Sequence, residues 1–350
     1  MKQNEKLPLV TVVTITYNLI ENKREDYIKQ CIESIHNQDY PFIEHIIIDG
    51  ASNDGTLELL HQYEDLNYVK VYSEPDNGIY DAMNKGIALA RGKYLNFMNS
   101  DDSFYDKEGI RRSVEYLEEK EADYSFADAM ILFENGNQEL WKGDISKLLL
   151  GGQYCHQSMF VKTELLRSMH GFNTSYEIAA DTDLMIRLYA CNRKYVKIPA
   201  CIVTYRMGGL SSQHQMWSRI EHSTAFYRHI GQHISLSQRD CFLLCWNPAL
   251  FDELPKEALL KLICKVPREY GLEHLLRTFV DKFNCSESKM SKRYYLLGFI
   301  PFLKSEYRND KRYFRLFNIL LLLKLVRRNN KKKFFLFGFL PLFKTKWDIK

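Results

Sequence analysis

A cluster of acidic and amide side chains follows the apolar run at residues 95–98. Asn99, Ser100, Asp101 and Asp102 come directly after L-N-F-M, a pattern typical of a buried strand that ends in a polar loop. In open α/β sheets, ligands bind at the carboxyl ends of the strands. Carboxylate oxygens at that edge suit Mg²⁺ or Mn²⁺, which in turn hold phosphate groups. A turn rich in Asp and Asn, without a ligand, is the alternative interpretation.

Polar and aromatic side chains also stand where two earlier strands are expected to end. Tyr17 and Asn18 follow the first of these strands, and Asp49 follows the second. An aromatic ring can stack on a nucleobase, and a carboxylate can accept a hydrogen bond from a base or a ribose. Together with an acidic pair that holds a metal, these residues predict a site for a nucleoside diphosphate. Neither a P-loop nor a G-x-G-x-x-G motif occurs, which argues against ATPases and dinucleotide-binding enzymes.

The elements that would position these residues alternate between strand and helix. Apolar and β-branched runs predict strands at Leu9–Tyr17, Phe42–Ile48, Tyr68–Ser73 and Tyr94–Met98. Apolar residues at helical spacing predict helices at Asp26–Gln38, Thr56–Glu64 and Ile79–Arg91. Such alternation is typical of a parallel sheet with right-handed crossovers. The first hundred residues therefore predict a nucleotide-binding α/β sandwich with a mostly parallel central sheet.

The pattern is looser after Asp102. Helices are expected at Ile110–Lys120 and Thr182–Cys191, strands at Asp123–Phe133 and Tyr195–Arg206, and a hairpin turn at Asn135-Gly136-Asn137. From Trp217 to about Phe283 the character is helical. We therefore expect a nucleotide-binding domain over 1–215, a helical extension over 216–288 and a separate tail over 289–350.

The C-terminal tail is basic, aromatic and repetitive. It carries 17 Lys and Arg against 3 Asp and Glu, whereas residues 1–288 carry 31 against 41. The sequence of Arg293–Lys304 returns at Lys333–Lys344, with a degenerate copy at Tyr313–Lys324, so the period is 20 residues. Units this short cannot bury an apolar face alone. The copies are expected either to stack on one another or to dock their apolar faces on a bilayer.

The composition is typical of a cytosolic globular protein. The 350 residues are 45% hydrophobic and 26% charged, enough for one large core or two modest ones. The eight cysteines show no paired C-x-x-C spacing and no accompanying histidine cluster, which predicts reduced thiols rather than a zinc site. We expect no signal peptide, and no uncharged run is long enough to span a membrane.

Four linked motifs resemble the family 2 glycosyltransferases of the GT-A fold, in the branch that builds bacterial surface polysaccharides. They are T-I-T-Y-N at 14–18, I-I-D-G-A-S-N-D-G-T at 47–56, S-E-P-D-N-G-I-Y-D-A-M-N-K-G at 73–86 and N-S-D-D at 99–102. Their order and spacing match the family, and the resemblance covers about Pro8 to Ser211. It implies inverting transfer of a sugar from a nucleotide-diphosphate donor. UDP is the expected nucleotide, with Mg²⁺ or Mn²⁺ on the diphosphate.

The resemblance also implies roles for individual residues. Tyr17 would stack on the donor base, Asp49 would hold the base or ribose, and Asp101 would be the main metal ligand. The full set of candidate donor-binding residues is Thr16, Tyr17, Asn18, Asp49, Asp76, Gly78, Asn84, Lys85, Asn99, Ser100 and Asp102. Asn99 and Gly50 stand where the family often has Asp, so the site carries less negative charge than is usual there.

Inverting transfer needs a general base that removes the proton of the acceptor hydroxyl. Asp181, in A-A-D-T-D-L, matches the Asp of the family's E-D element, with Ala180 in place of the Glu. Asp183 is the alternative base, and a third interpretation is that both acids only stabilise the start of a helix. His156 and Gln157 are expected on the acceptor side, although His156 fits a loop histidine without a ligand equally well.

The tail suggests where the protein works. Aromatic and aliphatic patches among basic residues suit the interface of an anionic membrane, where each Lys or Arg contributes about 1 kcal/mol. We therefore expect a cytoplasmic protein at the inner face of the cytoplasmic membrane, next to a lipid-linked saccharide acceptor of the kind used for lipopolysaccharide or capsule. Packing of the tail on the catalytic domain is the alternative. No RNA- or DNA-binding motif accompanies the basic charge, so no nucleic-acid partner is expected.

Two other functions remain open from the sequence. A sugar nucleotidyltransferase shares the metal and nucleotide chemistry, but it needs Gly-rich and basic residues for a triphosphate, which Thr14–Asn18 does not supply. A non-catalytic glycan-binding or scaffold protein can keep the fold, and the three replacements of family acids favour it. Asp49, Asp101 and Asp181 all persist, however, and this favours the enzyme.

Overall fold

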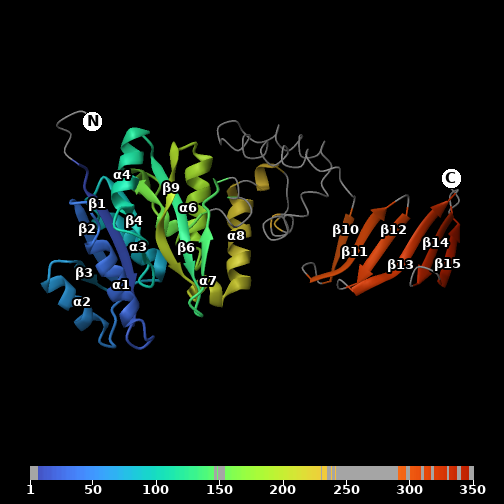
Figure 1. Cartoon of the computed structure of the whole chain (residues 1–350), viewed down its shortest axis with the longest axis horizontal. Coiled ribbons are helices and arrows are strands. Elements are labelled where there is room, and N and C mark those ends of the chain that lie inside the picture. Colours follow the sequence, from blue (N-terminus) through green and yellow to red (C-terminus); the bar gives the residue numbers. More distant parts are fainter. Residues whose placement is uncertain are drawn as a thin grey trace. The chain divides into compact units, whose positions relative to one another are not determined.

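The computed structural model describes residues 7–145, 148, 154–229, 231–234, 238 and 241, together with the strands of a C-terminal sheet between 291 and 346 (Figure 1). The chain divides into two units. The first contains Met1–Trp246 and Lys265–Leu275, and the second contains Asn247–Cys264 and Leu276–Lys350. All candidate site residues belong to the first unit.

Four parallel strands form the first half of the sheet in the first unit. They are β1 (Val10–Thr16), β2 (Ile43–Asp49), β3 (Lys70–Ser73) and β4 (Tyr94–Phe97), in the order β3-β2-β1-β4. The register of β1 pairs Thr16 with Asp49 and Val13 with Phe97. The β-branched run of β1 is buried on both faces, as expected for a central strand. This order brings the polar ends of β1, β2 and β4 to one edge of the sheet.

The sheet continues beyond β4 with strands of mixed direction. These are β5 (Ser103–Phe104), β6 (Tyr124–Leu132), β7 (Gln138–Trp141), β8 (Phe160–Lys162) and β9 (Tyr195–Arg206). β8 pairs antiparallel with β4 and β6, β6 pairs parallel with β9, and β9 pairs antiparallel with β5. β6 and β7 form the predicted hairpin, and Gly136 in its turn has a φ of +80°, a conformation that favours glycine.

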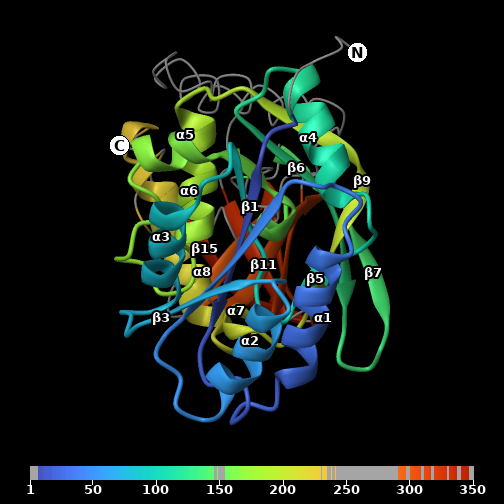
Figure 2. The ribbon, with the colours of Figure 1, turned by 90° about the vertical axis from the view of Figure 1, so that its left-hand side faces the viewer.

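Helices cover both faces of this sheet (Figure 2). The helices are α1 (Glu25–His36), α2 (Thr56–Asp65), α3 (Ile79–Leu89), α4 (Gly109–Glu119), α5 (Thr163–Ser168), α6 (Ala180–Ala190), α7 (Leu210–Gln213) and α8 (Gln215–His229), with short 3₁₀ helices at His156–Ser158 and Gly231–Ile234. Ile32 of α1 and Val114 of α4 share one core with Val12 of β1. On the opposite face Gly86 of α3 packs on Val13, which follows Val12 and therefore points the other way.

Six strands form an antiparallel sheet in the second unit. They are β10 (Ser291–Leu296), β11 (Ile300–Arg308), β12 (Lys311–Leu316), β13 (Ile319–Arg328), β14 (Lys331–Leu336) and β15 (Leu340–Lys346), paired in sequence order. β10, β12 and β14 begin 20 residues apart, so each sequence repeat forms one β-hairpin. The pairing of Arg293 with Lys304 recurs as Lys333 with Lys344. The copies therefore stack through strand pairing, and their docking on a bilayer stays a prediction.

Most predicted elements occur close to their expected bounds, and β9 spans Tyr195–Arg206 as predicted. The short elements β5, β8 and α5 were not predicted, because segments of two to six residues carry too little periodicity to be recognised. α8 begins the predicted helical stretch, whereas most of the rest of 216–288 lies outside the described residues. Within the part of the chain that is described, no helix has both the length and the apolar character to cross a membrane.

Candidate active site

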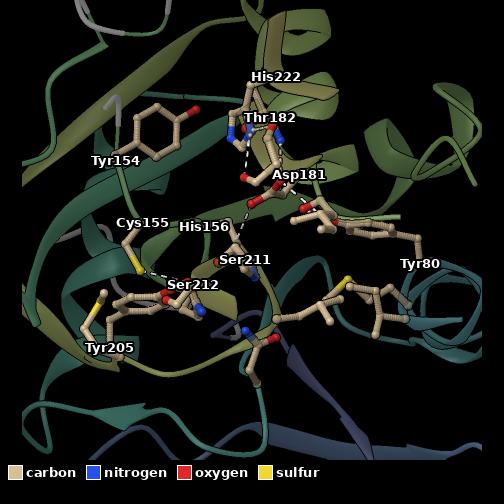
Figure 3. Close-up of a pocket in the computed structure, with 18 of the residues that line it drawn as sticks. Tyr80, Tyr154, Cys155, His156, Asp181, Thr182, Tyr205, Ser211, Ser212 and His222 are labelled. Carbon is tan, nitrogen blue, oxygen red and sulfur yellow. Dashed lines mark hydrogen bonds and ion pairs between the residues drawn. The ribbon is translucent and has the colours of Figure 1, made fainter. Parts of the chain in front are cut away.

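A cavity of about 400 Å³ lies between the loop that follows β4 and the start of α6 (Figure 3). Acidic, aromatic, imidazole and hydroxyl side chains line it. The residues that line the cavity include Tyr80, Asn99, His156, Asp181, Tyr205 and His222. Asn99 belongs to the N-S-D-D motif after β4, and Asp181 to the first turn of α6. The cavity therefore joins two of the motifs that the sequence predicts to act together.

Asp181 points into this cavity from the first turn of α6 (Figure 3). Its Oδ2 lies 3.3 Å from Nδ1 of His156, and its Oδ1 accepts a hydrogen bond of 2.7 Å from the N–H of Thr182. Burial by itself raises the pKa of Asp181, but His156 and the charge of His222 favour the anion and hold the pKa below its ordinary value. Because 22% of its side chain is exposed, Asp181 is an anion that a ligand can reach.

Asp183, the alternative base, is not among the residues that line the cavity. Its side chain is 2% exposed and pairs with Nε of Arg187 at 2.8 Å and with Nε2 of His229 at 2.7 Å. Arg187 in turn donates hydrogen bonds to the carbonyls of Met169 and Gly171. Burial raises the pKa of Asp183, but His229 and Arg187 outweigh it and the pKa lies below its ordinary value. Asp183 thus ties α6 to α8 and to the loop after α5.

The two residues expected on the acceptor side have different surroundings. His156 contacts Asp181, and its Nε2 is buried without a hydrogen-bond partner within the described ranges. Gln157 is fully buried. Its Nε2 donates a 2.5 Å hydrogen bond to Oδ2 of Asp102, and its Oε1 accepts one of 2.8 Å from Cys155. His156 therefore lies beside Asp181 in the cavity, whereas Gln157 connects the cavity wall to the N-S-D-D motif.

Two arginines hold the N-S-D-D motif. Oδ2 of Asp101 pairs with Nη1 of Arg24 at 3.1 Å, and the Asp101 carbonyl accepts a 3.2 Å hydrogen bond from Nε of Arg206. Asp102 is 2% exposed and accepts hydrogen bonds from the N–H of Arg206 and from Gln157. Burial, with a contribution from the charge of Asp101, raises the pKa of Asp102 well above its ordinary value. Asp101, whose side chain is 12% exposed, is the more accessible carboxylate of this pair, and it is not among the residues that line the cavity.

This motif fits a single divalent cation that shares its coordination with a diphosphate. Asp101 has a second oxygen beyond the one paired with Arg24, and Asn99 lines the cavity, whereas Ser100 between them is buried. Mg²⁺ in such sites takes one or two carboxylates plus water and substrate phosphates. Among the described residues no group of three or more His, Cys, Asp or Glu side chains is placed to hold a metal. A cation here would therefore depend on phosphate oxygens.

Asp49, at the end of β2, is fully buried and connects the ends of three strands. Its carboxylate accepts hydrogen bonds from Oγ1 of Thr16 at 3.0 Å, from N–H and Oγ of Ser52 at 2.8 and 2.6 Å, and from Oγ of Ser73 at 2.8 Å. Tyr17, next to Thr16, is 63% exposed, so its ring is accessible to a base. A direct contact between Asp49 and a base or ribose stays a prediction.

Gly50 permits a close approach between Tyr17 and Asp76. A Cβ at Gly50 would lie 2.7 Å from Oδ2 of Asp76 and 3.2 Å from Cδ2 of Tyr17. Asp76 also accepts a 2.9 Å hydrogen bond from the N–H of Gly78, whose φ is +108°. A larger residue at position 50 would displace both side chains. The structure therefore places Tyr17, Asp76 and Gly78 close to one another, and their binding of a donor stays a prediction.

The other candidate donor-binding residues make contacts within the protein. Asn18, with a φ of +44°, shapes the loop after β1. Lys85 forms an ion pair of 2.9 Å with Glu74. Both ends of the Asn84 amide bond to the backbone of Phe172, and Asn84 is not among the cavity-lining residues. A role of these three side chains in donor binding stays a prediction.

Several residues that line the cavity are not among the candidate site residues predicted from the sequence. Trp141 from β7, Tyr205 from β9 and His222 from α8 line the cavity, and these elements are far apart in the chain. Tyr80 lies inside the motif at 73–86 and could have been recognised there. Its hydroxyl donates a 2.5 Å hydrogen bond to the carbonyl of Ile178 and lies 3.5 Å from Oδ1 of Asp181.

Known proteins resemble the part of the chain that carries this site. The model of glycosyl transferase family 2 matches residues 11–182. An uncharacterized glycosyltransferase of Mycobacterium tuberculosis (strain CDC 1551) is 33% identical over 186 residues, which are 51% of this chain and 68% of that protein. The PGL/p-HBAD biosynthesis glycosyltransferase of Mycobacterium bovis BCG is 28% identical over 214 residues, 59% of this chain and 80% of the relative. The putative teichuronic acid biosynthesis glycosyltransferase TuaG of Bacillus subtilis is 35% identical over 131 residues, which are 37% of this chain and 50% of TuaG.

Solved structures with a similar fold are more distant in sequence. TarS 1–349 of S. aureus, in complex with UDP-GlcNAc, has a TM-score of 0.53 at 18% identity over 79% of this chain and 89% of that one. The mannosyltransferase PcManGT from Pyrobaculum calidifontis, in complex with GDP-Man and Mn²⁺, has a TM-score of 0.51 at 16% identity over 81% and 89%. The chain has the GT-A fold and is a glycosyltransferase that belongs to glycosyl transferase family 2.

Proposed function

We propose that this enzyme transfers a sugar, with inversion, from a UDP-sugar to a saccharide acceptor in the biosynthesis of a surface polysaccharide. The observation that carries the proposal is the position of Asp181. This carboxylate has a lowered pKa and faces a cavity that also reaches Asn99 of the N-S-D-D motif. The UDP-GlcNAc bound to TarS supports the donor class. TuaG is named for teichuronic acid biosynthesis and the relative from Mycobacterium bovis BCG for PGL/p-HBAD biosynthesis, and both names support a role in a biosynthetic pathway of this kind.

Asp181 is the general base in this proposal. The acceptor hydroxyl attacks the anomeric carbon from the face opposite the diphosphate, the new C–O bond forms, and the bond to the nucleoside diphosphate breaks. Asp181 takes the hydroxyl proton in the same step. His156, 3.3 Å away, keeps Asp181 ionised before the transfer and orients its carboxylate toward the cavity.

The donor half of the site recognises the nucleoside diphosphate. Tyr17 offers an exposed ring to the base, and Asp76 and Gly78 lie beside it. Asp101, together with the diphosphate, would hold Mg²⁺ or Mn²⁺, which supplies positive charge for the leaving group. Arg24 neutralises one oxygen of Asp101 at 3.1 Å. The Mn²⁺ in the PcManGT complex supports the choice of metal.

The half of the cavity that we assign to the acceptor is lined by aromatic rings. The rings of Trp141 and Tyr205 are 6.1 Å apart at 75°, and both residues line the cavity near Ser211 and His222. Apolar aromatic walls with a few placed polar groups are typical of small-molecule sites, and sugar rings present matching apolar faces. We assign this half to a saccharide carried on a lipid.

The basic tail over 289–350 completes this proposal. Its charge suits an anionic membrane surface, which would keep the enzyme at the cytoplasmic face beside a lipid-linked acceptor. Residues 1–215 would hold the catalytic machinery, with 216–288 as a helical extension. The structure adds that α8, at the start of this extension, belongs to the same unit as α6.

Calorimetric titration with UDP and GDP, each in Mn²⁺ and in EDTA, is the first test. Metal-dependent binding of UDP is the expected result. Binding of GDP alone would correct the donor class. Binding of neither nucleotide would contradict the proposed function and favour a scaffold protein on the same fold.

The substitution Asp181→Asn tests the base. The amide keeps the shape of the side chain but cannot accept a proton, so we expect transfer to fall by about 10²- to 10⁴-fold. Nucleotide binding should stay at the level of the wild type, because Asp181 lies on the acceptor side of the cavity. Sugar transfer at the rate of the wild type would show that another group is the base.

A further inference from the structure

Three backbone N–H groups immediately before α6 converge on one buried carboxylate. Glu221 of α8 is 6% exposed. Its Oε1 accepts a 2.9 Å hydrogen bond from the N–H of Glu177, and its Oε2 accepts bonds of 2.8 and 3.0 Å from the N–H groups of Ile178 and Ala179. Hydrogen bonds from backbone N–H groups to an ionised acceptor are among the stronger ones in proteins. Glu221 therefore fixes the course of the chain as it enters α6.

The segment that Glu221 holds leads directly to the proposed base. Ala179 is the N-cap residue of α6 and has no side chain that could cap the helix. Asp181 follows two residues later. Buried N–H groups must find partners, and the local sequence offers none here, so α8 supplies them. Ala180 stands where the resembling family has Glu, and the carboxylate in this region comes instead from Glu221, beyond the residues that the family model matches.

A second contact connects the same segment to α3. Tyr80 of α3 donates a hydrogen bond of 2.5 Å to the carbonyl of Ile178. The peptide groups next to Ile178 are thus bonded through their N–H groups to α8 and through a carbonyl to α3. Asp181 is left with little freedom to move away from His156.

We propose that Glu221 is a positioning residue for Asp181. It acts through the backbone of residues 177–179, which it holds so that the Asp181 carboxylate stays against His156 and inside the cavity. This inference rests on the proposed function, because it assigns Glu221 to the transfer reaction. A displacement of about 1 Å in a catalytic group can cost on the order of 10²-fold in rate. Loss of the hydrogen bonds to Glu221 should therefore lower the turnover rate.

The test compares three variants of the full-length chain. Glu221→Gln keeps the size of the side chain but removes its charge, Glu221→Asp keeps the charge, and Glu177→Gln removes a charge from an exposed side chain of the same segment. Amide hydrogen exchange of peptides covering 177–181, calorimetric binding of UDP with Mn²⁺, and steady-state turnover of the UDP-sugar are measured for each.

For Glu221→Gln we expect amide exchange in 177–181 to be on the order of 10-fold faster, since weaker hydrogen bonds open more often. The kcat should fall by on the order of 10-fold while the KM for the donor and the binding of UDP stay unchanged. Glu221→Asp should recover part of the kcat, and Glu177→Gln should match the wild type. A general loss of structure would instead change donor binding as well.

Two outcomes would overturn the inference. One is unchanged amide exchange in Glu221→Gln, and the other is faster exchange with a kcat equal to that of the wild type. The proposed function fails separately, if the wild type binds neither UDP nor GDP. Amide exchange then still decides whether Glu221 holds the segment before α6.

Discussion

Two carboxylates in the first turn of α6 have different surroundings and therefore different tasks. Asp181 contacts His156, lines the cavity and is partly exposed. Asp183 is buried between Arg187 and His229. Both have lowered pKa values, so ionisation alone does not separate them. Access to the cavity does, and it is the reason why we propose Asp181 as the base, whereas Asp183 holds α6 against α8.

The substitution Asp183→Asn should therefore reduce stability. It leaves Arg187 and His229 without their anionic partner in a buried site, and we expect the free energy of unfolding to fall by about 3 kcal/mol. Urea denaturation followed by circular dichroism measures the change. Asp26→Asn is the control, because this carboxylate is 82% exposed and its pairing with Lys29 is a surface contact. Equal effects of the two substitutions would contradict the assignment.

His45 should make stability depend on pH. Burial in β2 lowers its pKa from 6.5 to about 3. Between these values the unfolded chain binds a proton that the folded chain does not. His45 therefore lowers stability by about 1.4 kcal/mol for each pH unit of acidification below 6.5. The raised pKa of Asp102 acts in the opposite direction, because there the folded state binds the proton more readily.

The contribution of His45 is isolated by comparison with His45→Gln. Urea denaturation of both proteins at pH 7.5 and pH 5.5 should show that the wild type loses more stability on acidification than the variant. Parallel losses in the two proteins would show that His45 titrates normally in the folded state. Asp102 is common to both chains, so its effect cancels in the difference.

At the scale of elements, the site depends on how closely helices approach the sheet. Gly86 of α3 lies against Val13 of β1, where a Cβ would be 2.5 Å from Cγ1 of Val13. β1 ends at Thr16, next to Tyr17, and α3 carries the cavity residue Tyr80, so this contact holds α3 against the strand that leads to Tyr17. Glycine is needed here for space rather than for a special backbone angle.

Gly86→Ala should consequently destabilise the protein by about 1–3 kcal/mol, because the added methyl overpacks the contact between α3 and β1. Gly209→Ala is a matched control, since a Cβ there meets nothing within 4 Å and its φ is −69°. Thermal unfolding of both variants gives the comparison. If Gly86→Ala were as stable as the wild type, α3 would have to move freely on β1.

At the scale of the whole molecule, charge is divided unevenly along the chain. Residues 289–350 carry 17 basic and 3 acidic side chains, and the rest of the chain carries an excess of acid. The strands of this basic tail form three hairpins, one for each repeat of 20 residues, and the first four residue pairs of each hairpin have the same register. The hairpins present similar basic and aromatic positions in each repeat, and we propose that these positions dock on an anionic membrane surface.

Cosedimentation with vesicles tests the tail. The full-length protein should bind vesicles that contain phosphatidylglycerol at low salt, and binding should weaken at about 1 M salt, where the screening length falls to about 3 Å. Vesicles of phosphatidylcholine alone are the control. A chain that lacks 289–350 should stay in solution. Equal partitioning of the truncated and full-length chains would contradict membrane docking by the tail.

Much of the fold was predictable because its determinants are local. The β-branched run of β1, the alternation of strands with helices and the polar residues after β4 are features of short segments. They predicted a parallel sheet with helical crossovers, whereas the order β3-β2-β1-β4 came from the structure. Asp181 was a candidate base through the resemblance to the family. The repeat of 20 residues likewise predicted repeated units that either stack or dock on a bilayer, although not that each unit would be a β-hairpin.

The sequence by itself determined the family, the sheet that carries the site and the set of acids from which a base must be chosen. Only the tertiary structure decided how these acids differ. Asp183 meets His229 across 46 residues and Asp101 meets Arg24 across 77. Burial and ion pairing arise from such distant contacts, which hydrophobic periodicity does not encode. The division between Asp181 and Asp183, and the support of Asp181 by Glu221, could therefore be seen only once α8 was placed against α6.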